Sequence, residues 1–319
     1  MESFSGCSTW HRLRVKPRQS GSTATACRLT NDYIDSWTRA GAPRIAITEV
    51  RMVGTAEVNG TRLYYEVAGQ GAPVVLVHGL GLDTRMWDGQ FELLAGHYRV
   101  IRYDVRGFGK SALPTGAEFR YADDLRALLD SLDAPQAHLV GLSMGGRIAL
   151  HHALLYPDAT LSLTLVDSAL DGFDWSEQFG DSLDAIAAHA EQAGAKAGNE
   201  MWLQHELFAP ARERAECRAQ LAQIVGESSG WNWLNEPPVR GLDPPAADRL
   251  NEVRVPTLVV VGERDLPDFQ GIADRLAAEI PSARKIVMNG VGHMSNMEDV
   301  SAFNSIVLDF LRGVESVPR

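Results

Sequence analysis

A serine stands between two glycines in the run Gly141-Leu142-Ser143-Met144-Gly145, and its hydroxyl has the chemistry of a nucleophile. Where a strand turns sharply into a helix, the neighbouring backbone crowds the turn, so the positions two before and two after its tip must be small. The apolar run 137–140 precedes this serine, and apolar residues at helical spacing follow it until Pro157. The pattern predicts a strand, a tight turn with Ser143 at its tip and a helix; a structural loop of the same composition is the alternative.

A serine hydroxyl is a weak nucleophile near neutral pH, so Ser143 needs a base within hydrogen-bond reach and a carboxylate that orients this base. His293 follows the glycine-rich run 289–292 after the last predicted strand, and Asp265 follows the strand before it. Serine, aspartate and histidine in this chain order are typical of such sites. We therefore predict Ser143 as the nucleophile, Asp265 as the acid and His293 as the general base. The open alternatives are a surface loop at His293 and another acid, namely Asp167, Glu263 or Asp268.

The negative oxygen that develops during acyl transfer needs hydrogen-bond donors already aimed at it. We predict an oxyanion hole made of the backbone N–H groups of Met144, directly after the serine, and of Leu80, in the loop after an earlier strand. His78 begins that loop, and we assign it to shaping the loop rather than to proton transfer. The sequence has no run of His, Cys or carboxylate residues at metal-ligand spacing, so we expect no metal and no cofactor.

The run Gly109-Lys110-Ser111 has the ending of a phosphate-binding loop. Such a loop needs another glycine five residues before its last glycine, and Asp104 occupies that position. We therefore predict no nucleotide site here and interpret Asp104 as stabilising its own turn.

These residues must be positioned by a sheet whose strands alternate with helices. Two strands with alternating patterns surround the turn Asn59-Gly60, which predicts an antiparallel hairpin from residue 52 to 67. The continuous apolar run 73–77 follows, as expected for a strand buried on both faces of a parallel sheet. Further strands are predicted at 99–103, 137–140, 161–167, 257–261 and 284–288, with helical patterns at 86–94, 121–132, 148–155, 270–279 and 300–311. The sequence predicts an α/β protein with a mostly parallel, eight-stranded sheet flanked by helices.

Between Leu170 and Arg249 the alternation stops, and helical patterns occur at 183–197, 200–208 and 211–225. We predict an inserted helical lid at 170–249, between the two halves of the core at 51–169 and 250–315. Four of the seven tryptophans lie in this lid. Trp175 and Trp231 are our candidates for lining a substrate pocket, and the alternative is that the lid tryptophans only hold its helices together.

Composition restricts the class of protein. The chain has 319 residues, 45% hydrophobic and 22% charged, and a formal net charge of -11. A general nucleic-acid-binding protein needs a basic face to neutralise phosphates, so we expect no nucleic-acid partner. There is no run of eighteen apolar residues, so we expect no membrane span. These features favour a globular protein that acts on a small molecule.

The first fifty residues differ from the rest. Residues 1–50 contain seven Lys and Arg but four Asp and Glu, and they lack apolar periodicity at the start. We interpret them as a flexible N-terminal extension without a secretory signal. Of the three cysteines, Cys7 and Cys27 lie in the extension and Cys217 in the lid, so no disulfide framework is expected. A reducing, cytoplasmic location is the default expectation.

Five motifs together resemble the α/β-hydrolase superfamily, over residues 52–313. They are His78-Gly79-Leu80-Gly81, Asp104-x-Arg106-Gly107-x-Gly109-x-Ser111, Gly141-x-Ser143-x-Gly145-Gly146, Gly262-x-x-Asp265 and Gly292-His293. Within this superfamily, the runs 82–90 and 99–104 resemble the branch of esterases and 3-oxoadipate enol-lactonases. The chain has His-Gly at 78 and 79, the commoner esterase form, where the enol-lactonases carry Asn-Ser.

The resemblance implies a serine hydrolase that cleaves carboxylic esters of small to medium acyl chain through an acyl-enzyme on Ser143. A lactonase or a C–C bond hydrolase would use the same three residues. A small-molecule receptor on the same fold is the non-enzymatic alternative. In each case the expected partner is a small molecule, an ester or lactone for the enzyme.

Overall fold

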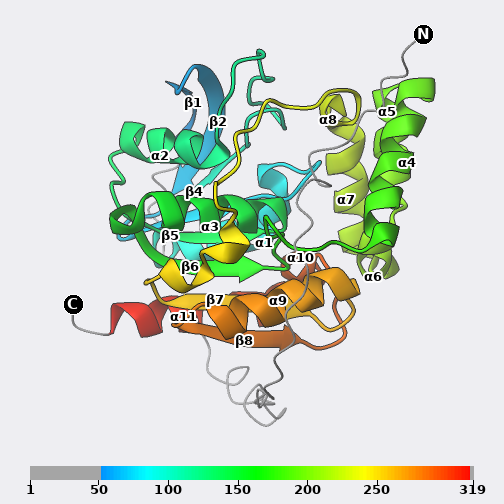
Figure 1. Cartoon of the computed structure of the whole chain (residues 1–319). Coiled ribbons are helices and arrows are strands. Elements are labelled where there is room, and N and C mark those ends of the chain that lie inside the picture. Colours follow the sequence, from blue (N-terminus) through cyan, green and yellow to red (C-terminus); the bar gives the residue numbers. More distant parts are fainter. Residues whose placement is uncertain (1–51, 317–319) are drawn as a thin grey trace.

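The computed structural model describes residues 52–316 (Figure 1), so the expected N-terminal extension 1–50 lies outside the described residues. An eight-stranded sheet in the order β1-β2-β4-β3-β5-β6-β7-β8 forms its centre. The strands are β1 (Met52–Val58), β2 (Thr61–Ala68), β3 (Pro73–Val77), β4 (Arg99–Tyr103), β5 (Ala137–Leu142), β6 (Thr160–Val166), β7 (Thr257–Gly262) and β8 (Ala283–Met288). The prediction of a mostly parallel, eight-stranded sheet flanked by helices is confirmed.

The antiparallel part of the sheet is the hairpin β1–β2 and its junction with β4. Asn59 and Gly60 connect the hairpin strands with φ angles of 45° and 69°, as a two-residue hairpin turn requires. Strand β2 pairs antiparallel with β4, and every later pairing is parallel. The carboxyl ends of β3, β5, β6, β7 and β8 therefore meet at one edge of the sheet, where ligands of open α/β sheets bind.

Helices cover both faces of the sheet (Figure 1). They are α1 (Asp88–Ala95), α2 (Tyr121–Ser131), α3 (Met144–Leu155), α9 (Pro267–Glu279), α10 (Ser295–Glu298) and α11 (Val300–Glu315). Along β3 the fully buried side chains alternate: Val74 and Leu76 pack in a core with α1 and α11, and Val75 and Val77 in a second core with α2, α3 and α9. A strand buried on both faces explains the unbroken apolar runs of the sequence.

Between β6 and β7 the chain forms a group of helices beside the sheet, seen together on the right of Figure 1. They are α4 (Glu177–Ala193), α5 (Ala195–Leu203), α6 (Ala209–Glu213), α7 (Ala215–Glu227) and α8 (Trp231–Leu234). The single helix expected at 183–197 is wrong, because Gly194 has a φ of 94° and separates α4 from α5. Glycine adopts this backbone conformation without a steric penalty.

Among residues 52–316, no helix combines the length and the apolar character needed to cross a bilayer.

Candidate active site

The turn at Ser143 joins β5 to α3 through a backbone conformation unusual for serine, with φ 56° and ψ -116°. A Cβ atom on Gly141 would lie 2.2 Å from the carbonyl oxygen of Gly145, and one on Gly145 would lie 2.1 Å from the carbonyl oxygen of Val77. Both distances are far below van der Waals contact, so each position requires glycine. A residue held in such a conformation costs about 1–3 kcal/mol, and residues of this kind cluster at functional sites. The Ser143 side chain remains partly exposed at the tip.

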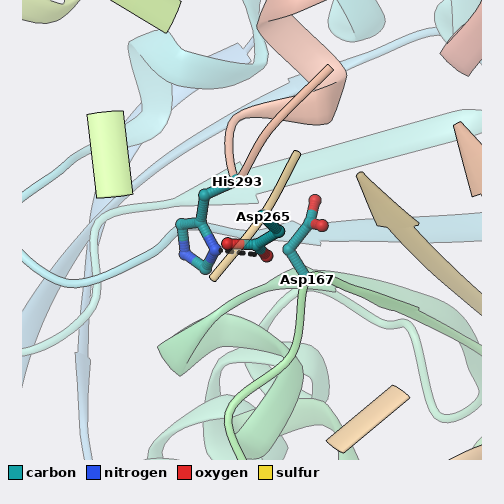
Figure 2. A group of neighbouring side chains, drawn as sticks. All are labelled: Asp167, Asp265 and His293. Atoms are coloured by element: carbon teal, nitrogen blue, oxygen red, sulfur yellow. Dashed lines mark hydrogen bonds and ion pairs between the residues drawn. The ribbon is translucent and has the colours of Figure 1, made fainter. Parts of the chain in front are cut away.

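Asp265 and His293 come from the loops after β7 and β8 and meet in a buried contact (Figure 2). The Nδ1 atom of His293 lies 2.9 Å from Oδ2 of Asp265, and the other oxygen of Asp265 accepts a hydrogen bond from the backbone N–H of Leu266 at 2.7 Å. An ionised carboxylate only accepts, so Nδ1 carries the proton and Nε2 is free to act as a base.

His293 Nε2 is buried and has no hydrogen-bond partner among the described residues. It is therefore not bonded to Ser143, although both residues line one cavity. In ligand-free enzymes such bonds are often long and tighten when substrate binds. Burial lowers the pKa of His293 to about 4, which keeps the imidazole neutral at physiological pH. A neutral imidazole is the form that can accept a proton.

A small cavity of about 10 Å³, room for about one water molecule, joins these groups. Its lining is apolar except for Ser143 and His293. The lining residues are Gly79, Leu80, Leu82, Leu142, Ser143, Trp202, Leu207, Phe208, His293 and Met294. No Lys, Arg, Asp or Glu lines the cavity. A charged ligand that entered it would therefore lose its hydration without gaining an ionic partner.

The two residues expected to supply oxyanion donors are Leu80 and Met144. Leu80 lines the cavity, and Met144 is the first residue of α3, whose first N–H groups lack partners within the helix. His78 fixes the loop that carries Leu80: its Nδ1 lies 2.8 Å from the carbonyl oxygen of Gly79, and its Nε2 accepts from the N–H of Val105 at 2.9 Å. The backbone N–H of Val105 can only donate, so Nε2 of His78 accepts and its Nδ1 carries the proton. His78 is therefore a neutral histidine that connects the two loops through hydrogen bonds.

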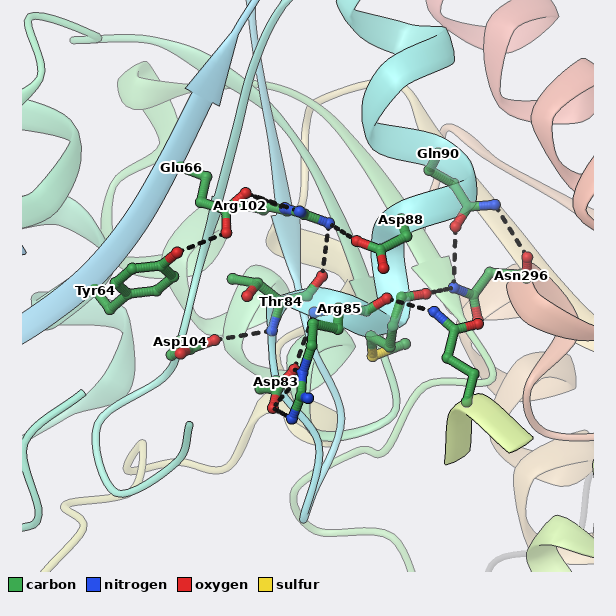
Figure 3. A network of polar contacts seen from close by, with 12 residues as sticks. Tyr64, Glu66, Asp83, Thr84, Arg85, Asp88, Gln90, Arg102, Asp104 and Asn296 are labelled. Atoms are coloured by element: carbon green, nitrogen blue, oxygen red, sulfur yellow. Dashed lines mark hydrogen bonds and ion pairs between the residues drawn. The ribbon is translucent and has the colours of Figure 1, made fainter. Parts of the chain in front are cut away.

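A buried polar network anchors the next turn of this loop (Figure 3). Asp104 accepts from the backbone N–H of Thr84 at 2.8 Å, and Arg102 donates to the carbonyl oxygen of Thr84 at 3.1 Å. Arg102 is held in turn by an ion pair with Glu66 at 2.8 Å. Asp104 also accepts from the N–H of Lys110 at 2.8 Å, so it stabilises its own turn and the loop after β3 together. Sequence reasoning missed Arg102 and Glu66, because alternating charges on a strand usually indicate a solvent-exposed face.

The tryptophan that lines the cavity is Trp202 of α5, and neither Trp175 nor Trp231 is in contact with it. Trp175 stacks on Phe179 with ring centres 4.8 Å apart and packs edge-on against Phe269 at 5.3 Å. Trp231 begins α8 and is partly exposed. The indole Nε1 of Trp202 is buried without a hydrogen-bond partner among the described residues. Composition could not separate the four tryptophans, because which one reaches the cavity depends on how α5 packs.

Asp167, the main rival for the acid, lies beside Asp265 and His293 at the end of β6 (Figure 2). One side-chain atom of each of the three residues lies within 4.8 Å of the others. The hydrogen bond to His293 nevertheless comes from Asp265. Among the other rivals, Glu263 accepts from the N–H of Gly290 at 2.8 Å and Asp268 accepts from Ser176.

Among the residues that the structure describes, Asp167, Asp265 and His293 are also the group close enough to share a metal ion. Both aspartates and the Nδ1 of His293 are already engaged in hydrogen bonds: His293 with Asp265, and Asp167 with Gly262 and Ser295. A metal held by all three residues would compete with these bonds. A hydrogen-bonded cluster therefore fits these residues better than a metal centre.

Comparison with known proteins agrees with this geometry. Residues 72–300 match the family model described as the alpha/beta hydrolase fold. RutD of Pantoea ananatis, named as a carbamate hydrolase, is 31% identical over 80% of this chain and 95% of its own.

Two solved structures are similar over about the same part of the chain. An enol-lactonase from Burkholderia xenovorans is 29% identical with a TM-score of 0.71, covering 81% of this chain and 100% of its own. A thermophilic esterase from Thermogutta terrifontis is 27% identical with a TM-score of 0.69, covering 82% and 99%. The resemblance to the esterase and enol-lactonase branch is thus confirmed. The chain belongs to the α/β-hydrolase family.

Proposed function

We propose that this protein is a serine hydrolase that cleaves uncharged carboxylic esters with a short acyl group through an acyl-enzyme on Ser143. The observation that carries the proposal is the shared cavity, in which Ser143 on its strained turn and the free Nε2 of His293 face the same apolar space. Asp265 holds the histidine in the tautomer that leaves Nε2 free.

In the proposed reaction the Ser143 oxygen attacks the ester carbonyl carbon while its proton passes to His293 Nε2. The carbonyl oxygen becomes an oxyanion that accepts hydrogen bonds from the N–H groups of Leu80 and Met144. The C–O bond to the alcohol then breaks, and His293 returns the proton to the departing alcohol. A water molecule then attacks the acyl-enzyme while its proton passes to His293, and His293 returns the proton to the Ser143 oxygen as the acid is released.

The preference for short, uncharged acyl groups follows from the cavity lining. The walls are formed by leucines, Phe208, Trp202 and Met294, and the space between them is only about 10 Å³, so a bulky acyl group has no room there. A carboxylate inside would be desolvated without a cationic partner, which costs far more than burying an alkyl chain of equal size. This argues against dicarboxylate substrates and for acetate-sized acyl groups.

A panel of p-nitrophenyl esters from acetate to laurate, run beside Ser143→Ala, tests the proposal. We expect the highest kcat/KM for the shortest esters and a fall in kcat of at least about 10⁴-fold in the variant. Equal rates for the two proteins would disprove the serine mechanism. Saturable binding of a neutral ester without turnover by the unaltered protein would instead favour the receptor alternative.

Lactones and carbamates are the second candidate substrates, favoured by the similarity to an enol-lactonase and to RutD. Both present a carbonyl carbon to the same nucleophile, and they differ from open esters in the leaving group. Uncharged lactones and alkyl carbamates therefore belong in the same panel. A kcat/KM for a lactone above that for every ester would reassign the substrate class while leaving the Ser143 chemistry intact. Cleavage of a β-diketone in preference to every ester would likewise reassign the reaction to C–C bond hydrolysis.

A further inference from the structure

A second carboxyl group lies next to the acid of the candidate triad, and the mechanism above does not use it. Asp167 has no exposed surface, and Asp265 and His293 are 6% and 1% exposed. One oxygen of each aspartate lies within 4.8 Å of the other, and Figure 2 shows the two side chains next to each other. The two residues are far apart in the chain and meet because β6 and β7 are paired neighbours.

Asp167 is held in place as firmly as a residue of the triad. Its Oδ1 accepts from the backbone N–H of Gly262 at 2.8 Å, and its Oδ2 accepts from the hydroxyl of Ser295 at 2.6 Å. Its backbone has a φ of 43°, a left-handed conformation that aspartate and asparagine tolerate better than most residues. Ser295 stands two residues after His293, so one short segment carries both the base and the support of Asp167.

Two carboxylates this close cannot both be ionised inside a dry protein. With His293 neutral, the cluster would carry two buried negative charges, and like charges in a low dielectric strongly favour retention of one proton. Burial raises the pKa of both Asp167 and Asp265 well above the usual range of an aspartate. Asp265 faces the imidazole that becomes positive during catalysis, so an ionised Asp265 is stabilised more by this charge than an ionised Asp167 would be. The proton therefore belongs on Asp167.

We propose that Asp167 is a positioning residue that holds one proton against Asp265 and so keeps Asp265 as the single charged acceptor for His293. The carboxylic acid of Asp167 donates a hydrogen bond to Asp265, and Gly262 and Ser295 fix its direction. The two aspartates then carry one negative charge instead of two, and His293 keeps its proton on Nδ1. The role in catalysis rests on the proposed function, whereas the shared proton does not.

Two substitutions separate this role from a merely structural one. Asp167→Asn places a neutral, hydrogen-bond-donating group of nearly the same shape at the same backbone conformation, so it imitates the protonated acid. Asp167→Gly removes the group, and glycine accepts a φ of 43° without strain. We expect Asp167→Asn to keep kcat within about threefold, and Asp167→Gly to lower kcat at least about tenfold with little change in KM, because the base loses its orientation.

Wild-type kcat in Asp167→Gly would overturn the proposal. So would an equal loss of kcat in both variants at unchanged melting temperature, because an ionised Asp167 would then be required. Thermal melting of each variant reports whether it folds.

A measurement independent of turnover tests the proton itself. Infrared difference spectra at neutral pH should show the carbonyl stretch of a protonated carboxyl in the wild-type protein and in Ser143→Ala, and Asp167→Asn should lack it. Absence of this band from the wild-type protein would overturn the proposal, as would stoichiometric metal that a chelator removes together with the activity. A Ser143→Ala variant with full activity but the band intact would instead count against the proposed function alone.

Discussion

Gly145 at the start of α3 lies directly against the main chain of Val77 at the end of β3, since a Cβ atom on the glycine would be 2.1 Å from the valine carbonyl oxygen. The turn that carries Ser143 and the loop that carries Leu80 therefore form one backbone unit. Ser143 and one of its proposed oxyanion donors cannot move apart without separating β3 from α3.

The first prediction concerns this contact. We expect Gly145→Ala to lower the free energy of unfolding by at least about 2 kcal/mol. The added methyl group would overlap the backbone at the end of β3, which the sheet holds in place. Ester hydrolysis should fall with it. Gly313→Ala is the matched control, since nothing lies within 4 Å of a Cβ at that position in α11, and it should be neutral or stabilise by up to about 1 kcal/mol. Urea unfolding measures both. Equal stability of the two variants would contradict the close contact.

The second prediction concerns the acid. Asp265→Asn should lower kcat by about 10³- to 10⁴-fold, because an amide that donates to His293 selects the wrong tautomer of the base. Asp268→Asn tests the neighbouring rival, whose carboxylate accepts from Ser176 outside the cavity, and it should leave kcat unchanged. Steady-state kinetics with a short p-nitrophenyl ester decide between them. A larger loss in Asp268→Asn would move the role of the acid to that residue.

The third prediction concerns the size of the acyl group. Trp202→Leu should open the cavity and raise the ratio of kcat/KM for octanoate over acetate esters by about tenfold, since each methylene accommodated in an apolar pocket contributes about 1–3 kcal/mol. The ratio is informative because any general loss of activity cancels from it. Trp231→Leu is the control, since Trp231 does not line the cavity, and its ratio should equal that of the unaltered protein. A shift in the control and none in Trp202→Leu would disprove our assignment.

The fourth prediction concerns stability in acid. Burial lowers the pKa of His152 to about 3, and its Nδ1 lies 3.0 Å from the Thr160 hydroxyl oxygen. In the unfolded chain the pKa of His152 is about 6.5, so below this pH the unfolded chain binds a proton that the folded protein does not bind. The free energy of unfolding therefore decreases as the pH falls. His152 should account for about 2 kcal/mol of the loss between pH 7 and pH 5.

The comparison for this prediction is the pH dependence of two variants. His152→Gln should unfold with a weaker dependence on pH over this range, although it is less stable at pH 7. His189→Gln alters an exposed histidine of α4 and should follow the unaltered protein. Parallel stability curves for His152→Gln and the unaltered protein would contradict a buried, neutral His152.

Much of the fold and part of the candidate site could be predicted because their causes are local. Gly141 and Gly145 are required by the sterics of a single turn, and their spacing is visible in five consecutive residues. Unbroken apolar runs mark strands buried on both faces, as the alternation of Val74 to Val77 between two cores shows. The loops at Asp265 and His293 end neighbouring parallel strands, so the hydrogen bond between these residues follows the strand order.

The sequence by itself determined the sheet, the serine turn and the chain order of the candidate site residues, since backbone sterics and hydrophobic periodicity act over a few residues at a time. Only the tertiary structure decided which tryptophan reaches the cavity, where α4 gives way to α5, and that Asp167 lies beside Asp265. Trp202 and Asp167 differ from their rivals by the packing of segments distant in the chain. Such packing depends on the shapes of many side chains at once, and no short stretch of residues contains that information.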